Sequence, residues 1–172
     1  MDKDNNSNNN KITKILFVCL GNICRSPAAE GIMRQLVEER HLAHLFTIDS
    51  AGIGNWHQGQ LPDHRMRRHG QRHGYLFDHR ARQLCRDDFQ RFDLLVGMDE
   101  ENLNAMARLA PDKTSRNKII LMARFLRHHP QYKTVPDPYY GGDSDFETVI
   151  ALLEDACEGL LDHLTNHRPQ SK

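Results

Sequence analysis

The sequence predicts an α/β fold, a single three-layer domain in which a four-stranded parallel sheet has helices on both faces. Short apolar runs alternate along the chain with segments whose apolar residues recur every three or four positions, as strands and amphipathic helices do. The chain has 172 residues and shows neither an internal repeat nor an interdomain linker, so a single domain is expected.

Four apolar runs are expected to be strands, at about residues 14–19, 45–49, 92–96 and 118–121. The segments between them are expected to be helical: one from Pro27, one at 62–72, one after Asp99 with an acidic first turn, a short one after the fourth strand, and a last one at about 145–163. Residues 1–11 are polar and rich in asparagine, which predicts a disordered tail before a domain at 12–168.

The composition argues against several classes of function. Lys and Arg total 23, as do Asp and Glu, so the chain lacks the basic charge expected of a nucleic-acid binder. No apolar run approaches the roughly 20 residues that span a bilayer, and no apolar signal segment is visible. Two of the 4 cysteines lie in one loop, which is typical of thiols used for chemistry in a reducing compartment. We therefore expect a cytoplasmic protein without a nucleic-acid or membrane partner.

The loop after the first strand carries a thiol and a guanidinium six residues apart, in the stretch Cys19-Leu20-Gly21-Asn22-Ile23-Cys24-Arg25-Ser26-Pro27. Because the loop lies between a strand and a helix, its backbone N–H groups and the positive end of the helix can converge on one oxyanion. That field favours a thiolate at Cys19, and the planar fork of Arg25 suits two phosphate oxygens. The sequence therefore predicts a phosphate-binding loop at the carboxyl edge of the sheet.

This stretch and a second motif, Asp137-Pro138-Tyr139-Tyr140-Gly141, resemble the low-molecular-weight protein tyrosine phosphatase family over about residues 14–164. The resemblance implies that the first strand lies inside the sheet. It also implies hydrolysis of phosphotyrosine and small aryl phosphates through a phosphocysteine. Cys19 is then the nucleophile, Arg25 the phosphate clamp and Asp137 the general acid and base. It implies no cofactor, phosphotyrosine-containing proteins as partners, and phosphate or vanadate as inhibitors. We also expect a monomer, although the sequence itself carries no signal for the oligomeric state.

The resemblance also implies two further sets of site residues. The residues that contact substrate or phosphate are Leu20, Gly21, Asn22, Ile23, Cys24, Ser26, Trp56, Tyr139 and Tyr140. The residues that support the loop are Ser50, His79 and Asp99. Flat aromatic walls would enclose a phosphotyrosine ring and leave phosphoserine short of the thiolate. Related enzymes that resemble phosphoarginine phosphatases carry Thr where this chain has Ile23, so Ile23 favours tyrosine.

Ordinary structural roles remain open for most of these residues. A cysteine at a strand end is often a small buried hydrophobe, and an Asp before a proline often forms an Asx turn. Ser26 and Asp99 suit helix N-caps. Trp56 could pack within its own loop, while Ser50 and His79 could lie on the surface.

Three further features stay open at this level. Cys24 could form a reversible disulfide with Cys19 that protects the nucleophile, or could be a buried thiol. The basic segment at 64–73 is interpreted as a solvated face rather than a docking patch. His69 and His73 are four residues apart, but Gly70 is expected to interrupt their helix and no further ligands accompany them, so no metal site is expected.

Two other functions compete with the phosphatase. A thiol-dependent arsenate reductase would use the same loop and relay electrons through further cysteines, of which only Cys85 and Cys157 remain. Cys157 falls in the apolar stripe of the last helix and Cys85 has no near neighbour. A non-catalytic phosphotyrosine-binding module would have no need of Cys19, Arg25 and Asp137 together.

Overall fold

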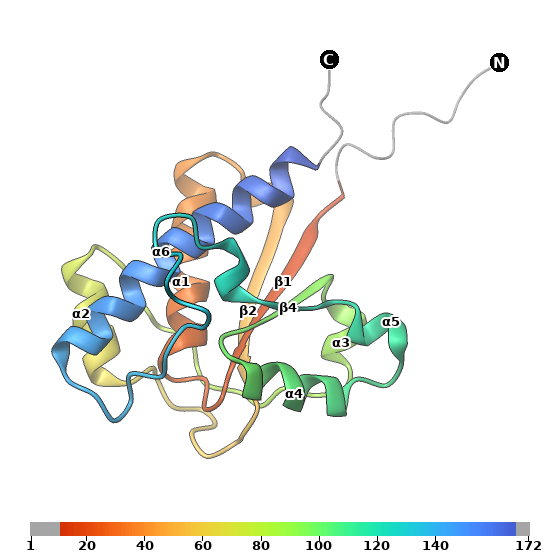
Figure 1. Ribbon diagram of the computed structural model, residues 1–172, viewed down its shortest axis with the longest axis horizontal. Helices are drawn as coiled ribbons and strands as arrows, with labels where there is room; N and C mark the ends of the chain where they lie inside the picture. Colours follow the sequence, from red (N-terminus) through yellow and green to blue (C-terminus); the bar gives the residue numbers. More distant parts are fainter. Residues whose placement is uncertain (1–10, 168–172) are drawn as a thin grey trace.

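The protein is described from a computed structural model, and the description is confined to residues 11–167 (Figure 1). Four parallel strands form one sheet in the order β2-β1-β3-β4. Their bounds are β1 Thr13–Cys19, β2 Phe46–Gly52, β3 Leu94–Gly97 and β4 Ile119–Leu121. The first strand therefore lies inside the sheet, and the expected α/β fold is confirmed. The predicted tail, apart from Lys11, lies outside the described residues.

Six α-helices and two 3₁₀ turns connect and cover the strands in the described part of the chain: α1 Arg25–Glu39, η1 Ala43–Leu45, α2 His64–Arg72, α3 Asp88–Arg91, α4 Glu100–Leu109, α5 Lys113–Arg116, η2 Met122–Phe125 and α6 Asp143–Asn166. Helix α1 begins two residues earlier than expected. The four-residue helices α3 and α5 were not predicted, because one turn is too short to show a periodic apolar pattern.

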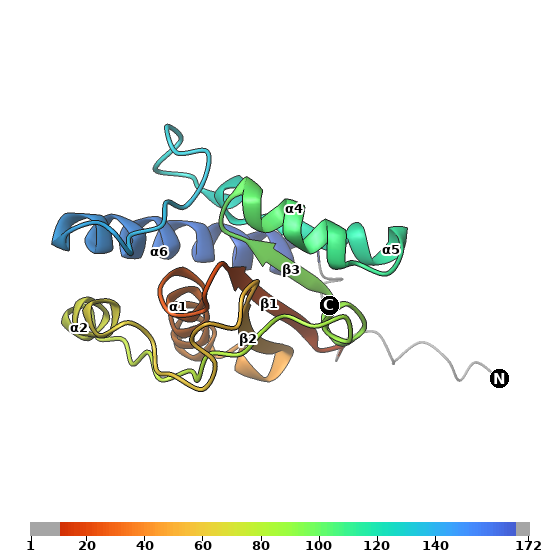
Figure 2. The same ribbon diagram turned by 90° about the horizontal axis from the view of Figure 1, so that it is seen from below.

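Alternate residues of β1 enter two separate apolar cores. Ile15 and Phe17 pack in the larger core with residues of α1 and α6, whereas Leu16 and Val18 face a smaller core with residues of α3 and α4. Side chains on a strand point alternately to opposite faces, so β1 has to be apolar on both faces from Ile15 to Cys19, where both faces are buried. Figures 1 and 2 show the resulting layers, with α1, α2 and α6 on one side of the sheet and α4 and α5 on the other.

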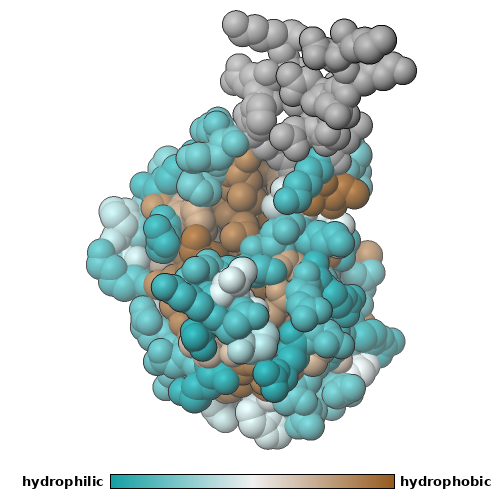
Figure 3. Space-filling model, turned by 90° about the vertical axis from the view of Figure 1, so that its right-hand side faces the viewer, coloured by the Kyte–Doolittle hydropathy of each residue, from teal (hydrophilic) through white to brown (hydrophobic). Residues whose placement is uncertain are grey.

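The face that lies on the right of Figure 1 is mostly hydrophilic, with hydrophobic side chains gathered in smaller patches (Figure 3). Among residues 11–167, none of the helices is both long enough and apolar enough to cross a membrane.

Helix α2 packs against the start of α6, so the interpretation of segment 64–73 as a solvated face is wrong at its centre. His69 is buried, and its ring stacks on Phe146 with centroids 5.7 Å apart. Its two ring nitrogens contact Glu147 and Asp143 of α6, at 2.5 Å and 3.1 Å. Gly70 does not interrupt the helix, which continues to Arg72.

Candidate active site

The loop after β1 keeps its shape because the β1–β2 ladder continues beyond the strands. The N–H of Ile53 donates to the carbonyl of Cys19, and the N–H of Gly54 donates to that of Leu20, both at 2.9 Å. The chain then turns back at Asn22, which has a φ of 58°. Asn is one of the few residues other than Gly that adopts this left-handed conformation readily, so the residue type suits the turn.

Asn22 is buried and its side-chain amide joins the loop to three other segments. Its Nδ2 donates to the hydroxyls of Ser26 and Ser50, at 2.8 Å and 3.0 Å. Its Oδ1 accepts from His79 Nε2 and from the backbone N–H of Arg82, both at 3.0 Å. Ser50 is wholly buried and His79 nearly so, so the surface alternative for both residues is wrong.

The Ser26 hydroxyl lies 3.0 Å from the Cys19 sulfur. Because this hydroxyl already accepts from Asn22, its own proton is available to the sulfur or to the carbonyl of Ala51, which is farther away at 3.4 Å. The N-cap of α1 is Cys24, so the capping alternative for Ser26 is wrong. Ser26 instead links the Asn22 amide to the thiol.

Arg25 is only 2% exposed and lies between two carboxylates. Its Nη1 donates to Asp99 Oδ2 at 2.6 Å and to the carbonyl of Val135 at 3.0 Å, and its Nη2 lies 3.5 Å from Asp137 Oδ2. Burial alone would lower the pKa of Arg25, but neighbouring Cys19, Asp99 and Asp137 raise it above its ordinary value. The guanidinium is therefore a fixed positive charge beside the thiol.

Each of the two aspartates around Arg25 both stabilises its local backbone and contacts Arg25, two roles that the sequence left as alternatives. Asp99 caps α4, since its Oδ1 accepts from the N–H of Asn102 at 2.9 Å, while its other oxygen holds Arg25. Asp137 forms an Asx turn with the N–H of Tyr139 at 3.1 Å. Its side chain is 40% exposed and its second oxygen faces Arg25, so it can exchange a proton with a bound ligand or with water.

These groups open into one pocket of about 310 Å³, lined by Cys19, Leu20, Gly21, Ile23, Cys24, Arg25, Trp56, His57, Asp137, Tyr139 and Tyr140. Leu20, Trp56 and Tyr140 are among the large apolar side chains that the described surface leaves exposed, at 43%, 65% and 96%. Such a rim is suited to a flat apolar group whose polar end reaches the thiol.

The structure brings ten of the predicted site residues to the pocket wall and sets the others behind it. Asn22, Ser26, Ser50, His79 and Asp99 do not line the pocket; they contact the loop or Arg25 from the protein side. His57 lines the pocket and was not predicted. Its position next to Trp56 in the same loop was the available signal.

Cys24 lies in the pocket wall as a buried free thiol. Burial, together with the charges of Asp63, Cys19 and Asp137, raises the pKa of this thiol well above its ordinary value, so it stays protonated at neutral pH. Cys19 and Cys24 are both reduced here, and their pairing under oxidation stays a prediction.

The site combines a thiol at the end of a central parallel strand, a buried arginine six residues later, and the N-terminus of a helix. This combination defines a class of α/β proteins that bind an oxyanion next to a cysteine side chain. Residues 14–170 match the family described as low molecular weight phosphotyrosine protein phosphatase.

Individual relatives agree over nearly the whole chain. A putative low molecular weight protein-tyrosine-phosphatase of Synechocystis is 44% identical over 88% of this chain and 96% of its own. The low molecular weight phosphotyrosine protein phosphatase of Homo sapiens is 41% identical over 86% and 93%. A solved protein tyrosine phosphatase from Entamoeba histolytica, with Hepes in its active site, is 43% identical and superposes with a TM-score of 0.87 over 90% of this chain and 97% of that one. The chain therefore belongs to the low molecular weight phosphotyrosine protein phosphatase family, a family of hydrolases.

Proposed function

We propose that the protein hydrolyses phosphotyrosine and small aryl phosphates through a phosphocysteine on Cys19, with Arg25 as the phosphate clamp and Asp137 as general acid and base. The observation that carries the proposal is the convergence of these three side chains on one pocket with apolar walls. A nucleophile, a fixed positive charge and a proton donor are what the cleavage of a phosphate monoester requires.

In the first step the Cys19 sulfur attacks phosphorus, and an S–P bond forms as the bond from phosphorus to the tyrosine oxygen breaks. Asp137 gives its proton to that oxygen, so tyrosine leaves as a neutral phenol. Arg25 and the backbone N–H groups of the loop hold the remaining phosphate oxygens as charge builds on them.

In the second step a water attacks phosphorus, Asp137 takes one of its protons, and the S–P bond breaks. Free phosphate and the Cys19 thiolate are regenerated. The Ser26 hydroxyl, 3.0 Å from the sulfur, donates to the departing thiolate and lowers the cost of its charge.

The walls account for the proposed choice of substrate. Trp56, Tyr139 and Tyr140 line the pocket, and Tyr139 and Tyr140 meet edge to face with centroids 4.9 Å apart. A phosphotyrosine ring spans the distance from this rim to the thiol, whereas phosphoserine is too short. Ile23 at the pocket wall is apolar, which fits an aryl ester better than the charged guanidinium of phosphoarginine.

The test is turnover of para-nitrophenyl phosphate and of phenyl phosphate in EDTA by wild type, Cys19→Ser and Asp137→Asn. Cys19→Ser is expected to lose nearly all activity. Asp137→Asn is expected to lose about 100-fold or more on phenyl phosphate, whose leaving group needs the proton, and less on para-nitrophenyl phosphate.

Asp145→Asn is the matched control, because this carboxylate lies near Asp137 in sequence but accepts from the N–H of Gly142 instead of lining the pocket. Equal losses on both substrates in Asp137→Asn, or normal turnover by Cys19→Ser, would overturn the mechanism. Vanadate and phosphate are expected to inhibit the wild type.

The proposal includes phosphotyrosine-containing proteins as substrates, a monomer, and action in the cytoplasm. All four cysteines are free thiols, as is typical of proteins in a reducing compartment. Nothing favours the arsenate reductase alternative, because Cys157 is completely buried in α6 and is thus closed to a thiol relay.

A further inference from the structure

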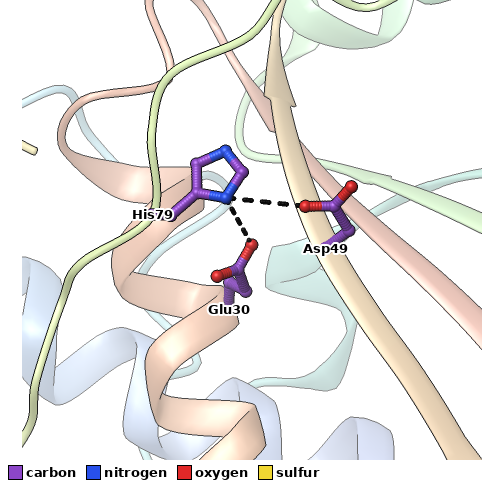
Figure 4. A group of neighbouring side chains, drawn as sticks. All are labelled: Glu30, Asp49 and His79. Carbon is purple, nitrogen blue, oxygen red and sulfur yellow. Dashed lines mark ion pairs between the residues drawn. The ribbon is translucent and has the colours of Figure 1, made fainter. Parts of the chain in front are cut away.

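A histidine and two carboxylates from three separate elements converge behind the phosphate-binding loop (Figure 4). Glu30 comes from α1, Asp49 from β2, and His79 from the segment between α2 and α3. One ligand atom of each lies within 4.8 Å of the others. No other group of three His, Cys, Asp or Glu residues within residues 11–167 meets this spacing.

The proton positions on His79 follow from its partners. Its Nε2 faces Asn22 Oδ1, which is an acceptor, so Nε2 carries a hydrogen. Its Nδ1 faces Glu30 Oε1 at 3.1 Å and Asp49 Oδ1 at 3.5 Å. Two carboxylate oxygens around one ring nitrogen require a positive charge between them, which either a proton on Nδ1 or a bound cation supplies.

Each of the two carboxylates has an inner oxygen, which faces His79 Nδ1, and an outer oxygen, which faces away from it. The outer oxygens meet guanidinium groups, since Arg82 donates to Asp49 Oδ2 at 3.1 Å and 3.2 Å, and Arg34 lies 3.5 Å from Glu30 Oε2. The inner oxygen Oε1 of Glu30 is buried and makes no hydrogen bond within the described residues. The inner side of the cluster therefore holds a buried carboxylate oxygen whose neighbour is His79 Nδ1, at 3.1 Å.

We propose that Glu30, Asp49 and His79 form a binding site for a divalent transition metal, with Zn²⁺ as the ion of choice. Zinc takes imidazole nitrogen and carboxylate oxygens at about 2.0–2.2 Å, so the ligand atoms of a tetrahedral site lie roughly 3.3 Å apart. The carboxylate oxygens of Glu30 and Asp49 lie 3.1 Å and 3.5 Å from Nδ1, and one ligand atom of each residue lies within 4.8 Å of the others. The metal replaces the proton on Nδ1, which passes to the buffer. Asp49 is partly exposed, which leaves room for water as the fourth ligand. This differs from the expectation of no metal site.

The chemistry of the donors selects against Mg²⁺ and Ca²⁺. These ions prefer an all-oxygen environment, whereas an imidazole nitrogen suits Zn²⁺ and its neighbours in the periodic table. The hydrogen bond from Nε2 to Asn22 fixes the tautomer in which Nδ1 is free for the metal, as the outer partner of a metal-bound histidine commonly does.

The site is also connected to the catalytic loop. His79 contacts Asn22, Asn22 contacts Ser26, and Ser26 contacts Cys19, at 3.0 Å, 2.8 Å and 3.0 Å. A metal at His79 is thus three hydrogen bonds from the thiol without touching the pocket. The proposal does not depend on the proposed phosphatase activity, because it is tested by binding alone.

The deciding measurement is diffraction at the zinc absorption edge on crystals of the wild-type protein equilibrated with Zn²⁺. An anomalous peak within about 2.3 Å of His79 Nδ1 and of the inner oxygens of Glu30 and Asp49 supports the site. Zinc found only at Cys19, Cys24 or surface histidines overturns it.

Calorimetric titration of Cys19→Ser with ZnCl₂ measures the affinity in solution without the catalytic thiol as a competing ligand. We expect one tight site with proton release, no comparable site for MgCl₂, and a loss of affinity of about tenfold or more in Glu30→Gln and His79→Gln. Glu147→Gln is the matched control, because Glu147 also pairs with a histidine but in the α2–α6 contact. Equal affinity in Glu30→Gln and Glu147→Gln contradicts the proposal.

Discussion

Asp99 has two tasks that one substitution separates. In Asp99→Asn the side chain can still cap α4, because Asn is as good an N-cap as Asp, but the nearer of the two negative partners of buried Arg25 is lost. A hydrogen bond to a charged group contributes about 1.5–3 kcal/mol, so kcat/KM for para-nitrophenyl phosphate is expected to fall about tenfold or more.

Asp112→Asn is the control for this prediction. Asp112 caps α5 through the N–H of Ser115 in the same way, yet it is not among the partners of Arg25. It is expected to leave kcat/KM unchanged. If Asp99→Asn loses no more activity than Asp112→Asn, the role of the Asp99 charge is refuted.

Single residues show both the reach of the sequence and its limit. The Cys19 to Pro27 motif indicated the thiol and the clamp without a structure. The charges that converge on His79 were not predictable, because Glu30 and Asp49 carry no motif and meet His79 only after α1, β2 and a distant loop have packed. His57 was missed although it follows Trp56 in the same loop, and the structure places it on the pocket wall beside Trp56.

At the scale of the element, Asp155 of α6 fixes the segment that follows η2. The backbone N–H groups of Arg127 and His128 and the ring of His129 donate to its carboxylate. Burial alone would raise the pKa of Asp155, but these hydrogen bonds lower it below its ordinary value. Asp155→Asn is therefore expected to lower the free energy of unfolding by about 2 kcal/mol at pH 7.

The stabilisation by Asp155 is expected to depend on pH, and the direction follows from its lowered pKa. A carboxylate whose pKa is lower in the folded state stabilises the protein above its unfolded pKa, and the stabilisation is lost as pH falls through the folded value. The difference between wild type and Asp155→Asn is thus expected to shrink from about pH 4 downward, as measured by urea unfolding. Half-exposed Glu158, on the same helix, is the control, and Glu158→Gln should change little. A difference that persists unchanged in acid would contradict this account.

The Phe77 ring packs against one glycine of α1 and one of α2. The Phe77 side chain is buried, and its ring atoms lie so close to Gly31 and Gly70 that a Cβ on either glycine would overlap them. In Gly70→Ala the better helix propensity of Ala, about 1 kcal/mol, opposes an overpacking cost of about 1–3 kcal/mol. Because Phe77 also stacks on Tyr75, it has little room to move, and a net fall in Tm of a few degrees is expected.

Differential scanning calorimetry of Gly70→Ala beside Gly142→Ala checks this. A Cβ at Gly142 meets no other atom within 4 Å, so that variant has no overpacking cost. Gly142 is the N-cap of α6, where Ala is a poorer cap than Gly, so a fall in Tm smaller than that of Gly70→Ala is expected. An unchanged or higher Tm in Gly70→Ala would show that the ring can shift aside.

The elements themselves were predicted unevenly. The strands and the long helices followed from apolar periodicity, and so did the alternation that makes the sheet parallel. The sequence could not show that α2 is buried at His69, because the partners of this histidine, Phe146, Asp143 and Glu147, lie more than seventy residues away. A charged segment has the composition of a solvated face whether or not another helix covers it.

For the whole molecule, a bound anion is expected to raise the stability of the fold. Phosphate at about 100 times its Kd adds about 2.7 kcal/mol, which corresponds to a rise in Tm of roughly 5–10 °C. Arg25→Lys keeps the charge but loses the planar fork, so its own rise should be clearly smaller when thermal unfolding is followed with and without phosphate. An equal rise in both proteins would show that phosphate binds elsewhere.

The order of the strands places the nucleophile Cys19 and the proton donor Asp137 in regions that we expect to differ in local stability. The thiol ends β1, which is paired on both sides, while Asp137 lies on a loop tied to the body through the hydrogen bonds of Val135 with Met98 and Arg25. When thermal fluctuations detach that loop, the protein can still bind phosphate, but Asp137 can no longer donate a proton to the departing phenol. Warming toward the unfolding transition should therefore turn the enzyme from a catalyst into a phosphate trap before the core melts.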